Sequence, residues 1–147
     1  MRGAFEKVWQ FATHPLFVRL VGLAVGLTFI YASLDKIHYP DRFADIVHDY
    51  QMLPLLTINA FALVMPWTEL VAGAALIAGV WRRGAGLVAM ALTVSFLIAI
   101  AWAEYHQLRI ECGCFDVSGM NSSEASWSLF IRDLPLLLGA VLVWRKG

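Results

Sequence analysis

Two cysteines, Cys112 and Cys114, are the only thiols of the chain, and a single glycine separates them in the stretch ECGCFD. Alpha carbons two residues apart can lie within the ~4.4–6.8 Å that a disulfide tolerates. The ring that such a disulfide closes is small and strained, and Gly113 supplies the backbone freedom that it requires. Strained, exposed disulfides exchange readily with other thiols. The pair therefore predicts thiol–disulfide redox chemistry.

Two other roles for the cysteine pair stay open. A purely structural disulfide is one, although a cross-link between neighbours closes almost no loop and adds little stability. A soft-metal site is the other, with the two thiolates as ligands of Cu(I) or Hg(II). Two cysteines alone do not complete a tetrahedral zinc site, and no cluster rich in His or Met accompanies them. We therefore expect no resident metal ion.

Charged neighbours of the cysteines bear on their reactivity. A nearby cation favours the thiolate, which is the attacking form, and Arg109 or His106 can supply that cation. Glu111 and Asp116 have the opposite effect, and the sequence leaves the balance open.

The rest of the chain is strongly apolar. Of its 147 residues, 60% are hydrophobic and 15% charged, and the mean hydropathy is +0.68. A soluble chain of this size cannot bury so much apolar surface in one core, so the lipid bilayer is the better solvent for it. The formal net charge is zero, which gives no basic surface for nucleic acid.

Four apolar stretches are long enough to cross a hydrocarbon core, which takes about 20 residues of helix. The first is expected to be a retained helix, because its apolar run is longer than that of a cleaved signal peptide. Short polar links join the stretches, and no repeat or linker divides them. The sequence thus predicts a single all-α domain over 1–147, an integral membrane bundle of four transmembrane helices at 16–34, 55–81, 84–103 and 127–144.

The segment 35–54 between the first two spans has an amphipathic pattern. Phe43, Ile46, Val47 and Tyr50 follow the spacing of one helical face, and acidic and basic residues occupy the other face. The pattern predicts a short amphipathic helix in the outer membrane interface. This helix is either a lid on the outer end of the bundle or a solvated connector.

The basic residues predict the orientation of the bundle, because Lys and Arg mark the cytoplasmic side of short loops. Seven of the eleven fall on the side that holds both termini: Arg2, Lys7, Arg19, Arg82, Arg83, Arg145 and Lys146. We therefore expect a multi-pass protein of a bacterial inner membrane with both termini in the cytoplasm. The cysteines then face the periplasm, where paired thiols are oxidised to disulfides.

Ionisable residues stand inside or beside the predicted spans. Lys36 ends the first span, Glu69 lies within the second, and Arg132 and Asp133 open the fourth. Charges at membrane depth are costly and tend to form pairs inside the bundle, so Glu69 is expected to pair with Lys36 or Arg132. Two interpretations stay open: a structural ion-pair network, or a polar site beneath the thiols that transfers protons or binds a quinone head group.

Four stretches together resemble a known family. The segments 32–54, 66–83, 111–116 and 132–138 occur in the order and spacing of the methylamine-utilisation family MauE, part of the DoxX-like group of four-span membrane proteins. Asp116 departs from the glycine that many relatives carry there. The residues that match by position are Lys36, Pro40, Glu69, Gly73, Cys112, Gly113, Cys114, Phe115, Arg132 and Asp133.

The resemblance implies disulfide chemistry in the periplasm, alongside a thioredoxin-like partner that matures a disulfide-rich exported protein. The chain is also similar to four-helix membrane oxidoreductases that pass thiol electrons to a quinone. The leading hypothesis is an inner-membrane thiol–disulfide oxidoreductase with Cys112 and Cys114 as its catalytic pair. Its supporting polar residues are Lys36, Glu69, Arg132, Asp133, Arg109 and His106.

Two alternatives belong to other classes of protein: a soft-metal carrier, and a non-catalytic assembly factor whose disulfide is only structural. The sequence does not determine the direction of electron flow, the identity of the partner, the binding of quinone or metal, or the oligomeric state.

Overall fold

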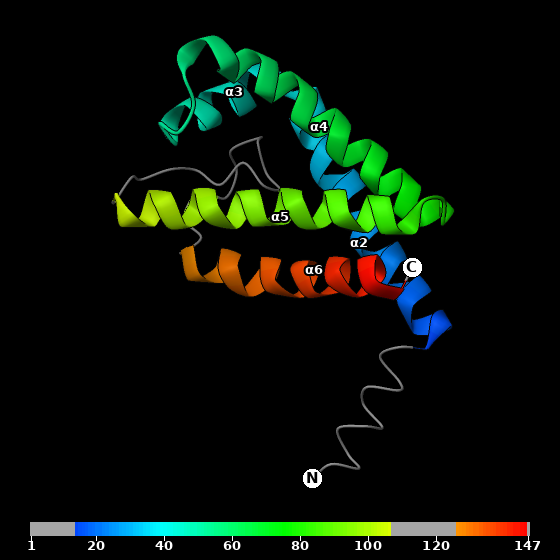
Figure 1. Ribbon diagram of the computed structural model, residues 1–147. Helices are drawn as coiled ribbons and strands as arrows, with labels where there is room; N and C mark the ends of the chain where they lie inside the picture. The colour runs from blue at the N-terminus through cyan, green and yellow to red at the C-terminus, as the bar shows by residue number, and fades with distance from the viewer. Residues whose placement is uncertain (1–13, 107–125, 147) are drawn as a thin grey trace.

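The structure is a computed structural model that describes residues 14–106 and 126–146, without the side chains of 126–130 and 132. This part of the chain is helical and contains no strand, which confirms the all-α prediction for it (Figure 1). Its helices are α2 (Pro15–His38), α3 (Pro40–Asp49), α4 (Leu55–Ala78), α5 (Arg82–Tyr105) and α6 (Ser126–Lys146).

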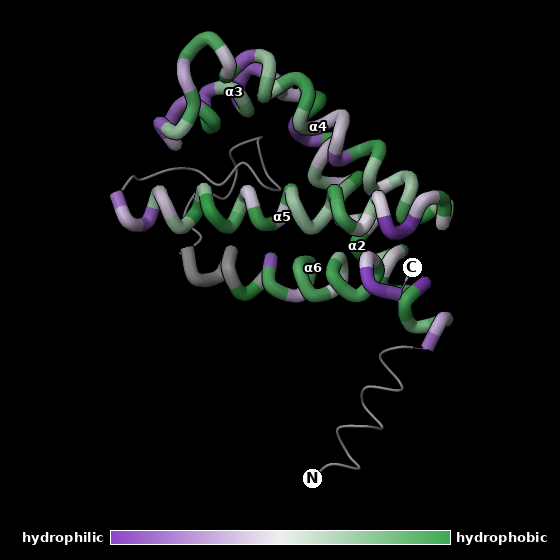
Figure 2. Tube along the Cα trace, viewed as in Figure 1, coloured by the Kyte–Doolittle hydropathy of each residue, from purple (hydrophilic) through white to green (hydrophobic). Residues whose placement is uncertain are grey.

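Three helices in the described residues are long and apolar enough to cross a membrane: α2, α4 and α5. Each has 24 residues and is therefore about 36 Å long, more than the ~30 Å of a hydrocarbon core. Figure 2 shows the apolar residues along them. Many large apolar side chains on these helices are exposed, among them Leu27 and Leu63, as expected where lipid replaces water.

The second predicted span ends earlier than expected. The sequence predicts one helix over 55–81, but α4 ends at Ala78, because Gly79 adopts the left-handed conformation with φ of 71°. Trp81 is also left-handed, with φ of 49°, and α5 begins at the next residue. The residues of this turn are as apolar as those of the helix before it, so the hydropathy pattern does not indicate where α4 ends.

Glycines bring the long helices together in two close pairs. A Cβ atom on Gly26 of α2 would lie 2.7 Å from the carbonyl oxygen of Gly73 in α4, so no side chain fits between these backbones. A Cβ atom on Gly86 of α5 would lie 2.9 Å from the backbone nitrogen of Trp144 in α6. Backbone contact therefore fixes α2 against α4, and α5 against α6.

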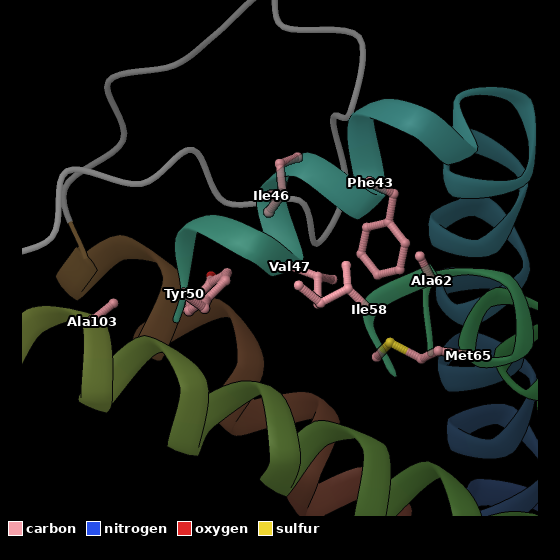
Figure 3. Packing of buried hydrophobic residues seen from close by; sticks show 8 residues of the cluster. All are labelled: Phe43, Ile46, Val47, Tyr50, Ile58, Ala62, Met65 and Ala103. Carbon is pink, nitrogen blue, oxygen red and sulfur yellow. The ribbon is translucent and has the colours of Figure 1, made fainter. Parts of the chain in front are cut away.

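The predicted amphipathic helix is present as α3, one residue after α2 ends. Phe43, Ile46 and Val47 on its apolar face are buried, and Tyr50 directly after it is buried too. Figure 3 shows Phe43 and Val47 directed towards α4, with Phe43 close to Ala62 and Met65. The helix is thus packed on the bundle through a core of its own.

The helices define two ends of the bundle. The end of α2, helix α3, the start of α4, the end of α5 and the start of α6 lie towards one end, which we call the α3 end (Figure 1). The turn between α4 and α5 and the end of α6 lie at the opposite end. A second core of apolar residues fills the bundle towards this opposite end, with Val18, Leu76, Ala85 and Val143 among its members.

Candidate functional site

A buried ion pair joins α2 to α4. The Nζ atom of Lys36 donates to both carboxylate oxygens of Glu69 at 2.8 Å. The two side chains are 0% and 2% exposed. The expectation that Glu69 pairs with Lys36 is therefore confirmed, and the long lysine stem reaches from the last turn of α2 to the middle of α4.

Two aromatic rings complete the surroundings of the lysine. Its Nζ lies 4.5 Å from the ring centroid of Phe96 in α5 and 5.4 Å from that of Phe43 in α3. Cations are attracted to the faces of aromatic rings, most strongly where water is excluded. The ammonium group is thus held by one carboxylate and two rings from three different helices.

A proline lies one turn before the carboxylate. Pro66 is buried inside α4, three residues ahead of Glu69. Proline has no backbone N–H, so the carbonyl of Ala62 lacks its helical hydrogen bond from that residue. Helix α4 nevertheless continues through Pro66 to Ala78, so Glu69 lies one turn after a missing backbone hydrogen bond.

The ion pair lines a small cavity of about 30 Å³, which we call the polar cavity after the ionisable residues among its lining. A cavity of roughly 10–15 Å³ is enough for one water molecule, so this cavity has room for ordered water. Asp133 of α6, which is 4% exposed, lies in its wall together with Thr93 of α5. All four long helices contribute to its lining: Thr28, Phe29, Ala32, Lys36, Glu69, Thr93, Phe96, Asp133 and Leu136.

The structure brings together three of the predicted polar residues and separates another from them. Lys36, Glu69 and Asp133 line one cavity. His106 instead follows the last residue of α5, where it is exposed and its ring lies 4.3 Å from that of Trp102. It comes ten residues after Phe96, about 15 Å along the helix axis, and so does not belong to this cavity.

The other predicted site residues cannot be placed in the same way. Cys112, Cys114 and Arg109 lie outside the described residues. Arg132 is part of α6, but its side chain also lies outside them.

Sequence reasoning did not single out Thr93 and Phe96. The span that contains them has no charged residue between 84 and 103, so nothing marked its interior as polar. Their spacing of three residues places them on one helical face, which is a weak signal without a partner to point to. The hydroxyl of Thr93 donates to the Ala89 carbonyl at 2.8 Å.

A second, apolar cavity of about 230 Å³ lies beneath α3 and shares Phe96 with the polar cavity. Phe96 lines both cavities, and Phe43 both contacts the lysine and lines the apolar one. The full lining of the apolar cavity is Phe43, Ile46, Val47, Tyr50, Met52, Leu53, Phe61, Met65, Ser95, Phe96 and Ala99.

Comparison with known families gives a match over residues 14–145 to the family described as methylamine utilisation protein MauE. The chain belongs to the MauE family. The resemblance predicted from the sequence is thereby confirmed. The matched region contains the ion pair of Lys36 and Glu69, Asp133 and both cysteines.

Three relatives, each named methylamine utilization protein MauE, support the assignment. The protein of Paracoccus denitrificans is 28% identical over 135 residues, which is 91% of this chain and 72% of the relative. The protein of Methylorubrum extorquens is 33% identical over 133 residues, which is 89% of this chain and 70% of the relative. The protein of Methylophilus methylotrophus is 34% identical over 101 residues, which is 68% of this chain and 53% of the relative. No solved structure matches this MauE chain.

Proposed function

We propose that this MauE-family membrane protein is a thiol–disulfide oxidoreductase that acts in methylamine utilisation, with Cys112 and Cys114 as its redox pair. A thiolate of the reduced pair attacks the disulfide of a periplasmic thioredoxin-like protein and forms a mixed disulfide. The second cysteine then displaces the partner. Two electrons and two protons pass to the partner, which leaves as a dithiol, and the MauE pair is left as a disulfide. The same steps in reverse reduce the pair.

The buried charges towards the α3 end are the observation that carries this proposal. Placing Lys36, Glu69 and Asp133 inside an apolar bundle is costly, and ionisable groups at such depth commonly mark a functional site. The α5 helix ends at this end of the bundle, and Cys112 follows Tyr105 by seven residues. Seven residues span at most about 25 Å, so Cys112 is tethered within that distance of the end of α5.

We infer a role in proton transfer for the polar cavity. Thiol oxidation releases protons and disulfide reduction consumes them. A water-sized cavity lined by Lys36, Glu69 and Asp133 offers exchangeable protons inside the bundle. In this proposal Arg132 contributes from α6, and Arg109 and His106 favour the thiolate from outside the cavity.

We further infer that α6 is a fourth span and that α3 lies in the periplasmic interface of an inner membrane. The 21-residue α6 packs against α5 through Gly86, which supports its membrane crossing. The described basic residues at the opposite end support a cytoplasmic location for that end: Arg19, Arg82, Arg83, Arg145 and Lys146. The cysteine pair then faces the periplasm.

Trapping of the mixed disulfide tests the proposal. The cysteine that displaces the partner is the resolving one, and replacing it by serine should make the mixed disulfide with the thioredoxin-like partner accumulate. One of the two variants Cys112→Ser and Cys114→Ser should therefore accumulate this adduct. The double variant should show none, and Ser118→Ala in the same segment should behave as the wild type. Mass spectrometry of the cross-linked peptides identifies the attacking sulfur. Absence of adduct from both single variants would overturn the exchange.

A redox titration separates this proposal from the alternatives. The pair should titrate as a reversible two-electron couple in thiol–disulfide buffers. Retention of one Cu(I) or Hg(II) ion per reduced protein, without electron exchange, would assign the pair to metal carriage. If the double serine variant folds and keeps full function, the disulfide has only a structural role.

A further inference from the structure

An open hollow lies at the turn between α4 and α5, at the end of the bundle opposite α3. It has a volume of about 750 Å³ and is lined by Gly79, Trp81, Arg82, Arg83 and Gly84. Small-molecule sites commonly have volumes of roughly 300–1,000 Å³, so this hollow is large enough for a lipid head group. Both charged side chains in its lining are cations.

The turn holds one of the two guanidinium groups in place. A Cβ atom on Gly79 would lie 2.6 Å from Nη2 of Arg82 and 3.1 Å from its Nε, so the guanidinium lies directly against the backbone of Gly79. Arg82 is partly buried as a result, whereas Arg83 beside it is exposed. A guanidinium that is already positioned loses less conformational freedom when it binds an anion.

The two arginines have no carboxylate partner within the described residues. Neither of them forms a salt bridge there. Every described Asp and Glu lies in the polar cavity or towards the α3 end. The described charged residues at the opposite end are all cations: Arg19, Arg82, Arg83, Arg145 and Lys146. The electrostatic complement of this end is therefore an anion.

The end of α6 adds positive charge close to the hollow. Gly86 of α5 is in backbone contact with Trp144 of α6. Arg83 comes three residues before Gly86, and Lys146 comes two residues after Trp144, so both lie about 3–5 Å beyond this contact towards the same end. Figure 2 shows the hydrophilic residues at the start of α5 and at the end of α6.

The position of the hollow along the helices points to the head-group region of the bilayer. Helices α4 and α5 are both long and apolar enough to cross a membrane, so the turn between them lies where the chain leaves the hydrocarbon core. Trp81 in this turn is 86% exposed, and tryptophan is enriched at the membrane interface. Arginine binds phosphate through two parallel hydrogen bonds, and basic pockets beside membrane helices bind phosphate head groups.

We propose that this hollow binds the phosphate of an anionic phospholipid, with Arg82 and Arg83 as donors to the phosphate oxygens. An anionic head group is favoured over a zwitterionic one, because a choline group would bring a positive charge next to the same cations. In the orientation proposed above, this lipid belongs to the cytoplasmic leaflet. The inference does not depend on the chemistry of the cysteine pair.

Native mass spectrometry of the full-length protein in detergent, titrated with a short-chain phosphatidylglycerol, tests the hollow. The wild type should bind this lipid at least fivefold more tightly than phosphatidylcholine of the same chain length. One arginine contributes about fivefold to the affinity for anionic lipid, so Arg82→Gln with Arg83→Gln should weaken binding about 25-fold. Should this variant not fold, Arg83→Gln alone leaves Arg82 packed on Gly79 and should weaken binding about fivefold.

The matched control is Arg145→Gln with Lys146→Gln. It removes the same number of charges from the same end, at exposed positions outside the lining of the hollow. These charges act on a bound phosphate only through water and salt, so binding should weaken by less than about threefold. Equal losses in the two double variants would indicate a diffuse surface charge and would overturn the site.

Two further measurements separate the lipid from other anions. Equal affinity of the wild type for phosphatidylglycerol and phosphatidylcholine would overturn the preference for an anionic head group, and with it the proposal. Inorganic phosphate at the same concentration as the lipid should leave the bound lipid in place. Full displacement by inorganic phosphate would make the hollow a site for a soluble anion and would overturn the assignment to a phospholipid.

Discussion

At the scale of residues, the Lys36–Glu69 pair dominates the energetics of the site. Both side chains are buried, and each charge depends on the other for its stabilisation. Burying two ions has a desolvation cost that their attraction only offsets when the geometry is good. The bidentate contact at 2.8 Å and the ring of Phe96 provide that geometry.

Removing one member of the pair should destabilise the protein strongly. Lys36→Met leaves a buried carboxylate without its counterion, and the expected loss is about 3–5 kcal/mol in the free energy of unfolding. Unfolding in detergent by added SDS measures the change. Lys146→Met, at an exposed lysine in the last turn of α6, is the matched control and should change stability by less than about 0.5 kcal/mol.

Removing both members separates a structural pair from a functional one. Replacing a buried ion pair by apolar residues is often neutral for stability, so Lys36→Met with Glu69→Leu should recover most of the loss of the single variant. If the pair serves the redox reaction, thiol–disulfide exchange should fall even though the double variant is folded. Normal exchange in this variant would make the pair purely structural.

At the scale of elements, the close approach of α2 and α4 depends on two glycines. Gly26→Ala would place a methyl group 2.7 Å from the Gly73 carbonyl oxygen, so the helices must separate. Overpacking of this kind costs about 1–3 kcal/mol. SDS unfolding should show that loss.

Gly84→Ala in the first turn of α5 is the control for this change. Its added methyl group would meet the Trp81 ring at 3.7 Å, an ordinary contact. Alanine suits a helix better than glycine by roughly 0.5–1 kcal/mol, so this variant should be unchanged or slightly more stable. Equal destabilisation by both variants would contradict a special role for the Gly26–Gly73 contact.

The sequence was informative about elements wherever hydrophobic periodicity or length carried the signal. The three long apolar helices and the amphipathic α3 followed from that pattern. The end of α4 did not follow from the hydropathy pattern, because Gly79 and Trp81 end the helix within a stretch that stays apolar.

For the site, the sequence predicted the ionisable members but not the neutral ones. Lys36 and Glu69 stand out as charges in apolar surroundings, so their pairing could be expected. Thr93 and Phe96 are ordinary residues for a membrane helix, and only the packing of α5 against the other helices gives them a place in the site. Which helix faces contact each other is a property of three-dimensional packing that one sequence does not encode locally.

At the scale of the whole molecule, the two ends differ in charge. The described acidic residues outside the polar cavity are Asp35, Asp41, Asp45, Asp49 and Glu104, and all of them lie towards the α3 end. The described arginines and lysines at the opposite end follow the pattern of a cytoplasmic face.

Thiol labelling tests this orientation. After reduction, an impermeant maleimide applied to intact spheroplasts should modify Cys112 and Cys114. A cysteine introduced by Lys146→Cys into the double serine variant should react only once the cells are opened. Labelling of the native cysteines only after opening would invert the bundle and remove them from the oxidising compartment.

The two glycine-bound helix pairs have a mechanical consequence. Lys36 and Glu69 belong to the same pair, α2 with α4, whereas Thr93, Phe96 and Asp133 belong to the pair α5 with α6. The polar cavity thus lies between two helix pairs, each held by close backbone contact. Any sliding of one pair past the other would reshape the cavity and move Phe96 relative to Lys36, yet it would leave the salt bridge unbroken.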